Sequence, residues 1–167
     1  SALIPYTARV VLERVSGRRE VELDQFVTGY RKTVRKPDEL IVEIILPKPK
    51  QRSVVKWYKV SKRKDLDIST VSAGFRIDIN DTNQIQNAML VYGGMAERVK
   101  RSSSAEAFLQ GKPWTRETIE ATMPLIDNDF NPISDARGSK EFRRIVARNL
   151  LLKFWDDTRK ETNGAAA

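Results

Sequence analysis

The feature that most constrains the fold is a strict alternation of apolar and polar side chains between Thr70 and Ile79. Successive side chains of a β-strand point to opposite faces of a sheet, so this pattern predicts a strand with one buried face and one solvated face. Turn-forming residues follow from Asn80 to Asn83, and Ile85 to Tyr92 returns as a second strand. Together with the β-branched and aromatic run from Val54 to Ser61, these segments predict a three-stranded antiparallel sheet.

Helical patterns occupy most of the chain after this sheet. Ser103 and Glu106 have the spacing of a capping box, and Gly111 suits the left-handed residue that ends a helix. Thr115 can cap a second helix. Pro124 predicts a kink or an early end of that helix, because proline lacks a backbone donor and clashes with the preceding turn.

The longest helical pattern runs from about Ser139 to about Arg159. Its apolar residues recur at helical spacing and predict one broad buried stripe. The members of this stripe are Phe142, Ile145, Val146, Leu150, Phe154 and Trp155. The carboxy-terminal domain therefore combines a sheet with about three helices, as in the α+β class.

The first 49 residues are rich in strand patterns. Alternation on either side of Ser16-Gly17 predicts a β-hairpin, and Glu39 to Leu46 reads as an apolar strand that Pro47 ends. Asp24 is expected to cap a short helical turn. We therefore expect two parts, residues 1–49 and 50–162, which join at the proline-containing stretch Pro47-Lys48-Pro49-Lys50, and a frayed tail at residues 163–167 that has nothing to bury.

Composition excludes several kinds of site. The 167 residues include no cysteine and no histidine, which removes disulfides, thiolate zinc sites, iron–sulfur ligation and a cysteine nucleophile. No metal site and no catalytic side chain is expected, so any redox chemistry must come from a bound cofactor. No apolar run is long enough to span a membrane and no signal peptide is recognisable, and we therefore expect a cytoplasmic location without a membrane partner.

The net charge of +8 leaves nucleic-acid binding to be weighed. The densest basic region, Lys48 to Lys64, is interpreted as a solvated basic face, and no nucleic-acid partner is expected. The alternative is a basic nucleic-acid-binding module whose affinity falls steeply with salt. Gly93-Gly94 is interpreted as structural, because two glycines at a strand end permit close backbone packing. The arginines from Arg137 to Arg148 are expected to pair with Asp135 or Glu141.

The most suggestive chemistry lies in the turn from Lys59 to Asp67. Four cations and two carboxylates lie there between two predicted strands, where they can hold an anion or position an aromatic ring. The competing interpretation is a solvent-exposed charged hairpin whose acids partly neutralise its bases. Trp57, Trp114 and Trp155 are expected in the core or an interface.

The order of several motifs resembles one family. These motifs are Phe26-x-x-Gly29-Tyr30-Arg31-Lys32-Thr33, Glu39-Leu40-Ile41, Val91-Tyr92-Gly93-Gly94-Met95-Ala96, Asp129-Phe130-x-Pro132-x-Ser134-Asp135 and Asp135-x-Arg137-x-Ser139-x-x-Phe142-Arg143. They resemble the carboxy-terminal part of the flavin subunit of molybdenum hydroxylases, in particular bacterial xanthine dehydrogenase. The resemblance implies that residues 1–49 are the end of a PCMH-type FAD-binding domain and that residues 50–162 are similar to the carboxy-terminal domain of the CO dehydrogenase flavoprotein.

In such enzymes the complete flavin subunit carries FAD between an iron–sulfur subunit with [2Fe-2S] clusters and a molybdopterin-containing subunit, and passes electrons to NAD. By resemblance, Leu40 and Ile41 border the isoalloxazine ring. The turn Lys59 to Asp67 approaches the flavin, with Lys62 or Arg63 as the cation beside it. A cation there would stabilise negative charge on the reduced ring. The implied cofactor-binding residues are Leu40, Ile41, Lys59, Lys62, Arg63, Asp65 and Asp67.

One departure from the family concerns the glycine-rich segments that hold the FAD pyrophosphate, which have no counterpart in this sequence. The chain is therefore expected to be a fragment that supplies one wall of the FAD site, binds FAD weakly or not at all, and is inactive alone. The alternatives within the superfamily are a carbon monoxide dehydrogenase and an aldehyde or quinoline oxidoreductase. A cofactor-free adaptor is the remaining alternative.

Overall fold

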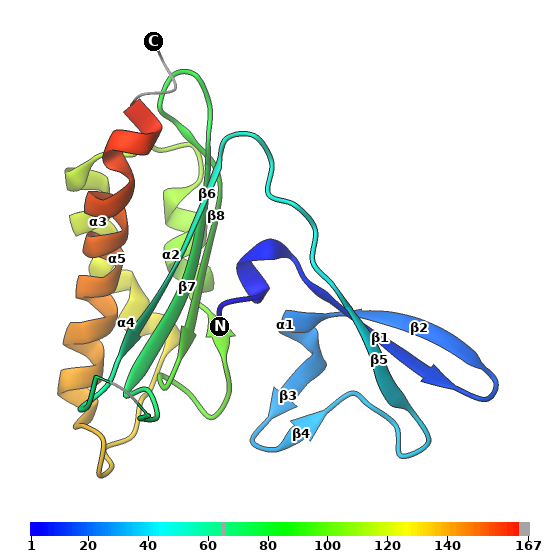
Figure 1. The fold of residues 1–167 in the computed structure, drawn as a ribbon. Helices are drawn as coiled ribbons and strands as arrows, with labels where there is room; N and C mark the ends of the chain where they lie inside the picture. The colour runs from blue at the N-terminus through cyan, green and yellow to red at the C-terminus, as the bar shows by residue number, and fades with distance from the viewer. Residues whose placement is uncertain (65, 164–167) are drawn as a thin grey trace.

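The computed structural model describes residues 1–64 and 66–163, with side chains as far as Arg159. Figure 1 shows two lobes, which we define as an amino-terminal lobe, residues 8–46, and a carboxy-terminal lobe, residues 53–163. A short amino-terminal segment, residues 1–7, contains the 3₁₀ helix η1 (Ile4–Tyr6) and lies against the larger lobe. The mixed α+β architecture agrees with the class predicted from the sequence.

The amino-terminal lobe is built on the strand order β2-β1-β5. The central strand β1 (Arg9–Arg14) pairs antiparallel with β2 (Gly17–Glu22) and β5 (Leu40–Ile45). The predicted hairpin and the predicted strand before Pro47 are both confirmed. Between them lie α1 (Leu23–Phe26) and the two-stranded sheet of β3 (Val27–Gly29) and β4 (Lys32–Thr33).

Asp24 does not have its predicted capping role. Glu22 occupies the N-cap position of α1 without a side-chain cap, and Asp24 lies inside the helix. The Asp24 carboxylate instead reaches Arg101 of the other lobe, with 3.5 Å between the charged atoms. A tertiary ion pair has therefore taken the place of a local cap.

The carboxy-terminal lobe contains an antiparallel sheet in the order β6-β7-β8-β9. The first strands are β6 (Ser53–Val60), β7 (Val71–Ile79) and β8 (Ile85–Gly93), which match the three that were predicted. The prediction of a three-stranded sheet is wrong by one strand, because the two-residue β9 (Lys100–Arg101) pairs with the end of β8. Two residues are too short a run to produce an alternating pattern in the sequence.

The prediction that β7 has one solvated face is also wrong. Helices cover its first face, and residues 1–7 cover part of its second face. A Cβ at Gly74 would collide with the backbone oxygen of Ser1, and the Arg76 side chain is buried where its Nη1 donates to Pro5 O at 3.2 Å. Protein groups therefore take the place of water as contacts of this face, and the buried Arg76 side chain is hydrogen-bonded within the protein.

The helical layer consists of α2 (Ser103–Leu109), α3 (Arg116–Thr122), the 3₁₀ turn η2 (Met123–Leu125), α4 (Ile126–Asp129) and α5 (Lys140–Asn163). Thr115 caps α3 as predicted, since its side chain accepts from Thr118 N. The expected distortion at Pro124 is confirmed by the change to 3₁₀ geometry. Within the described residues, no helix is long and apolar enough to cross a membrane.

The predicted capping box at Ser103 and Glu106 is wrong. Ser102 is the N-cap residue of α2, and the Asp129 carboxylate accepts the amide of Ser104 at 3.0 Å. Glu106 accepts the amide of Leu90 at 2.7 Å and binds Arg101. A carboxylate that is distant in the sequence therefore caps this helix, while the local one joins it to the sheet.

The apolar stripe of α5 is confirmed only in its second half. Leu150 and Phe154 are buried in the main core between helices and sheet, whereas Phe142 is 44% exposed and Ile145 is 56% exposed. Asn163 belongs to α5, and the remainder of the predicted frayed tail, residues 164–167, lies outside the described residues.

Candidate functional site

The turn implicated by the sequence connects β6 to β7 at one end of the sheet. Arg63 organises its described part: its amide donates to Asp67 Oδ2 at 3.0 Å, and its Nη2 donates to Leu66 O at 3.1 Å. The hydrogen bond that the Arg63 backbone amide donates is the main reason that the pKa of Asp67 is lowered. Asp65, the other predicted carboxylate, lies outside the described residues.

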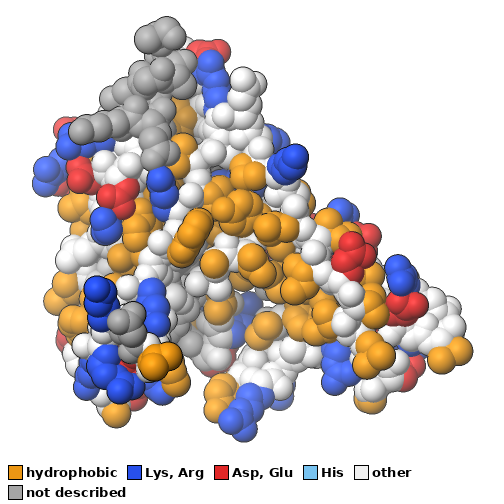
Figure 2. All heavy atoms as spheres, viewed as in Figure 1, with side chains coloured by type: hydrophobic (Ala, Val, Ile, Leu, Met, Phe, Trp, Pro, Cys, Tyr) orange, Lys and Arg blue, Asp and Glu red, His pale blue; other side chains and the backbone are white. Residues whose placement is uncertain are grey.

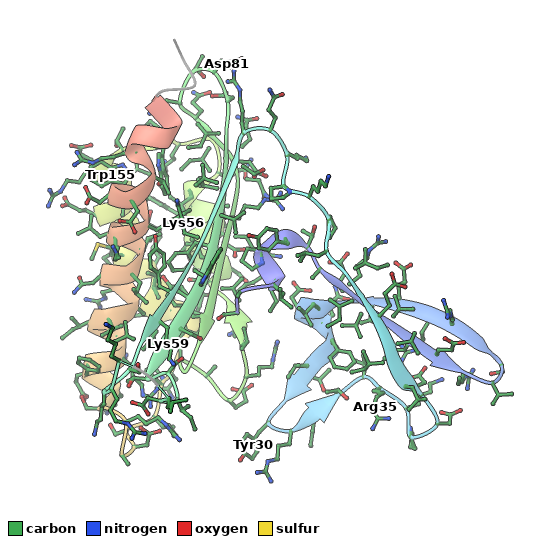
Figure 3. All side chains as sticks on the ribbon, viewed as in Figure 1. Tyr30, Arg35, Lys56, Lys59, Asp81 and Trp155 are labelled. Atoms are coloured by element: carbon green, nitrogen blue, oxygen red, sulfur yellow. The ribbon has the colours of Figure 1, made fainter. Side chains whose placement is uncertain are left out.

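Lys62 joins the turn to a loop that is distant in the sequence. Its Nζ donates to Ala136 O at 2.6 Å, and nearby Thr70 Oγ1 donates to Arg137 O at 3.2 Å. The Lys62 ammonium therefore has a structural partner in the protein. The other described cations of the turn are Lys59, which is exposed near the end of β6 (Figure 3), Lys64, which is also exposed, and Arg63, whose exposed side chain donates to Leu66 O.

The loop that receives Lys62 is held by a buried arginine at the start of α5. Arg143 is 3% exposed, and its Nη2 donates to Asp135 Oδ1 at 2.7 Å. Its Nη1 donates to Thr70 O and to Gly94 O. The predicted pairing with Asp135 is confirmed for Arg143 and Arg137, whereas Arg148 pairs with Asp127. The Arg137 amide and the Arg143 side chain, in that order, hold the pKa of Asp135 below its usual range.

Gly94 has the structural role that the sequence predicted. Its φ of +79° is in the left-handed region, and a Cβ there would collide with Thr70 O. The glycine lets the end of β8 approach the start of β7, where both carbonyls meet the Arg143 guanidinium. Since Gly94 O already accepts from Arg143 and no lysine bond is found here, this pair of glycines does not form a phosphate loop within the described structure.

A largely apolar cavity of about 270 Å³ lies beside the turn. Its lining includes Val60, Lys62, Thr70, Arg137 and Phe142. The exposure of Phe142, which contradicts its predicted burial, is explained by this position: the ring borders a cavity at the surface and does not enter the main core.

Leu40 and Ile41 lie on a different lobe from the turn. Both side chains belong to β5, where they are 70% and 50% exposed. Val42, Ile44 and Leu46 are also exposed, so the apolar side chains of this edge strand extend over both of its faces. Figure 2 shows hydrophobic side chains gathered in the hollow between the lobes. Leu40 and Ile41 lie in the amino-terminal lobe and the turn lies in the carboxy-terminal lobe, so a ligand that touches both would have to bridge the two lobes (Figure 1).

Trp57 is a candidate that the sequence interpretation missed. Trp114 is buried in the core as predicted, whereas Trp57 is 63% exposed. It pairs with Gly74 across β6 and β7, on the sheet face opposite the helices. The available signal was alternation: Tyr58 and Val60 pack on the core, so Trp57 and Lys59 must point to the opposite face.

These residues fit one wall of a flavin site. An indole ring and apolar side chains suit a planar ring system, and nearby cations suit its negative charge after reduction. The described residues include no glycine-rich phosphate cradle, and no group of three or more acidic residues that could hold a metal is found among them. The chemistry of this arrangement suits the binding and polarisation of a planar ring.

Comparison with known proteins decides the family. Residues 56–158 match the family model of the CO dehydrogenase flavoprotein C-terminal domain. Residues 1–49 match the model of the FAD binding domain in molybdopterin dehydrogenase. The chain belongs to the flavin-subunit family of the molybdenum hydroxylases.

Relatives of this flavin-subunit chain include different enzymes. It is 34% identical over 151 residues to xanthine dehydrogenase from Emericella nidulans, and the matched region covers 89% of this chain and 11% of that protein. It is 30% identical over 167 residues to the nicotinate dehydrogenase FAD-subunit from Eubacterium barkeri, with 98% of this chain and 56% of the relative covered. The chain thus spans about half the length of this FAD-subunit and a small part of the longer relative.

Two solved structures share the fold. Carbon monoxide dehydrogenase from Hydrogenophaga pseudoflava superimposes with a TM-score of 0.83 at 24% identity, over 90% of this chain and 52% of that one. Quinoline 2-oxidoreductase from Pseudomonas putida 86 gives a TM-score of 0.81 at 22% identity, over 99% and 55%. The two-lobed arrangement of the flavin-subunit chain is therefore shared by members whose names differ in substrate.

Proposed function

We propose that this chain forms one wall of the FAD site, and a surface for subunit contact, in a molybdenum hydroxylase of the xanthine dehydrogenase type. One observation carries the proposal. The cationic turn lies at one end of a sheet whose face towards the other lobe bears the exposed Trp57, and that other lobe bears the exposed apolar residues Leu40 and Ile41. When bound, FAD supplies the electron transfer, from [2Fe-2S] clusters and a molybdopterin centre in partner subunits to NAD.

Each part of the wall has its own task in this proposal. Leu40 and Ile41 border the ring and exclude water from it, and Trp57 extends the same apolar surface from the opposite lobe. Lys59 and Arg63 place positive charge beside the ring, which favours its reduced form. Lys62 and Asp67 keep the turn in place through their bonds to Ala136 O and to the amide of Arg63. Asp65 completes the predicted set of site residues.

A second candidate function follows from the relatives. The nicotinate dehydrogenase FAD-subunit matches nearly the whole chain, so a nicotinate-type hydroxylase has support as well. Carbon monoxide dehydrogenase and quinoline 2-oxidoreductase share the same fold. The choice falls on the xanthine dehydrogenase type because xanthine dehydrogenases from several organisms are 30–34% identical to this chain. Complementing a strain that lacks the flavin subunit of each enzyme separates these candidates.

The flavin role is tested by titrating the chain with FAD and with riboflavin, followed by flavin fluorescence. Because the wall faces the ring, we expect weak saturable binding of both flavins with affinities within about fivefold of each other, since the described residues hold no pyrophosphate cradle. Trp57→Ala and Arg63→Ala should each weaken binding by about tenfold, which corresponds to about 1.4 kcal/mol.

Arg116→Ala is the matched control, because Arg116 is an exposed cation paired with Glu120 on α3, away from the turn. Its affinity for both flavins should equal that of the parent chain. Equal weakening by all three substitutions would mean that only net charge or stability matters. A folded chain that binds neither flavin at millimolar concentration would contradict a preformed ring wall.

A further inference from the structure

The cluster around Arg143 brings together parts of the chain that are far apart in the sequence. One guanidinium contacts the start of β7 at Thr70 O, the end of β8 at Gly94 O, and the Asp135 carboxylate in the loop before α5. This side chain is almost fully buried. Burial of a charge is unfavourable unless each acceptor is well placed, so the contacts are geometrically demanding.

The same loop also binds the turn from Lys59 to Asp67, which we call the flavin-side turn because the proposed function places it beside the flavin. Asp135 Oδ1 accepts the amides of Arg137 at 2.8 Å and Gly138 at 3.3 Å, which fixes the loop conformation. Between these residues, the carbonyl of Ala136 accepts Lys62 Nζ at 2.6 Å. Arg143 is therefore connected to the turn through Asp135, the loop backbone and Lys62, in that order.

We propose that Arg143 is a positioning residue for the flavin-side turn. It holds residues 135–138 against the start of β7 and so presents the carbonyl that captures Lys62. This anchors one end of the turn, while the bond between the Arg63 amide and Asp67 closes its other part. The consequence for the flavin rests on the function proposed above, whereas the positioning of Lys62 does not.

A purely stabilising role for Arg143 predicts a different behaviour. The same helix carries Arg148, which pairs with Asp127 at a site away from the turn, with a side chain 37% exposed. If only ion pairs on α5 matter, loss of either arginine affects the turn equally. If Arg143 positions the turn, only its loss releases Lys62.

The test is the rate of reductive methylation of individual lysines in the 167-residue chain, followed by mass spectrometry well below the melting temperature. In Arg143→Gln, Lys62 should react at least about fivefold faster, because its amine loses the carbonyl partner. Lys59 is the internal standard and should stay within about twofold. Arg148→Gln should leave both rates unchanged, and Arg143→Lys should restore part of the protection of Lys62.

Asp135→Asn provides a second variant that keeps the shape of the loop residue. We expect a smaller rise in the Lys62 rate, together with faster amide hydrogen exchange in residues 61–69. An unchanged Lys62 rate in folded Arg143→Gln, or an equal rise at all lysines, would overturn the proposal. If Arg143→Gln does not fold, an unchanged Lys62 rate in Asp135→Asn has the same meaning.

The methylation assay contains no flavin, so its outcome is independent of the proposed cofactor role. Release of Lys62 in Arg143→Gln with unchanged flavin affinity would support the positioning role and contradict the contribution of the turn to the flavin wall. Protection of Lys62 that persists in this variant, with weakened flavin binding, would overturn the positioning role and leave the flavin wall in place.

Discussion

Strands β5 and β7 are both rich in apolar residues, yet their surroundings are opposite. β5 is Leu-Ile-Val-Glu-Ile-Ile and is exposed along most of its length. β7 is almost entirely buried, because helices cover one face and residues 1–7 lie on the other. The difference shows that an apolar strand pattern indicates side chains that tend to be buried, but it does not indicate which segment of the chain, or which other molecule, buries them.

The two lobes differ in the same way in their cores. A continuous core of aromatic and aliphatic side chains joins the sheet to the helices of the carboxy-terminal lobe. The buried cluster of the amino-terminal lobe comprises Val10, Leu12 and Phe26. The larger lobe can thus stabilise itself, while the smaller one depends more on its ion pairs and on its junction with the larger lobe.

The largest effect is expected for Phe154→Ala. Phe154 is fully buried, with its ring 5.4 Å from that of Phe75 and 5.5 Å from that of Trp114. Its truncation should lower the free energy of unfolding by about 3–5 kcal/mol, through lost burial and a residual cavity. Urea denaturation followed by tryptophan fluorescence measures this change. A loss below about 1 kcal/mol would show that the larger lobe is not the stable half.

Arg76→Met probes the junction between the lobes. Arg76 forms a buried bidentate pair with Asp78 at 2.7 and 2.9 Å, and its Nη1 also holds Pro5 O. Its loss leaves Asp78 with Asn87 as a weak partner at 3.3 Å. We expect a destabilisation of up to about 3 kcal/mol, because a buried carboxylate loses its counter-charge.

Small-angle X-ray scattering of Arg76→Met should also show a wider distribution of distances between the lobes. Arg116→Met, which removes an exposed ion pair with Glu120, should change stability by less than about 0.5 kcal/mol and leave the scattering profile unchanged. A scattering profile of Arg76→Met identical to that of the parent chain would mean that the hydrogen bond from Arg76 to Pro5 O does not position the lobes.

Acid should destabilise the amino-terminal lobe before the carboxy-terminal lobe, through protonation of Glu39. Its carboxylate accepts from Arg19 at 2.7 and 2.9 Å and from the amide of Lys36 at 2.7 Å, and these bonds lower its pKa to about 2. Since the ordinary pKa of this carboxyl is 4.5, its contribution to stability is fully present above pH ~4.5 and is lost as the pH falls towards about 2.

Amide NMR signals of β1 and β5 should therefore weaken between pH ~4 and ~2, before those of β7 and β8. Glu39→Gln should flatten this pH dependence in the amino-terminal lobe only. Simultaneous loss of all signals in the parent chain would show that the two lobes unfold as one unit, against the contrast drawn between them.

The smallest effect is expected for Ile44→Thr on β5. Ile44 is 52% exposed, so the substitution should change the free energy of unfolding by less than about 1 kcal/mol. The matched change in β7, Ile77→Thr, places a hydroxyl in the core and should be several times more destabilising. Equal values from urea denaturation would remove the distinction between the covered and the uncovered strand.

Local patterns were sufficient for most elements of the fold. Alternation predicted β7 and the turn residues after it predicted β8. Thr115 predicted the start of α3, and Pro124 predicted its end. Predictions failed where a partner distant in the sequence replaced the local one. Asp129 instead of the local residues caps α2, and Asp24 binds Arg101 of the other lobe.

The candidate site was only partly accessible from the sequence. The resemblance selected the turn and the Leu40-Ile41 pair, but it gave no indication that Lys62 is bound to Ala136 O. Trp57 was missed because an aromatic residue in a strand is consistent with either face until its neighbours are assigned to the core.

By itself, the sequence determined the kind of most elements and the family of the chain, because periodicity and short motifs depend on neighbouring residues. Tertiary structure alone decided which faces are covered and which charges are already bound. Residues 1–7 buried the face of β7 that the sequence predicted to be solvated, and the buried Arg143 side chain joins the start of β7 to the loop that binds Lys62. Burial and hydrogen bonding depend on which distant segments meet in space, and a local pattern does not contain that information.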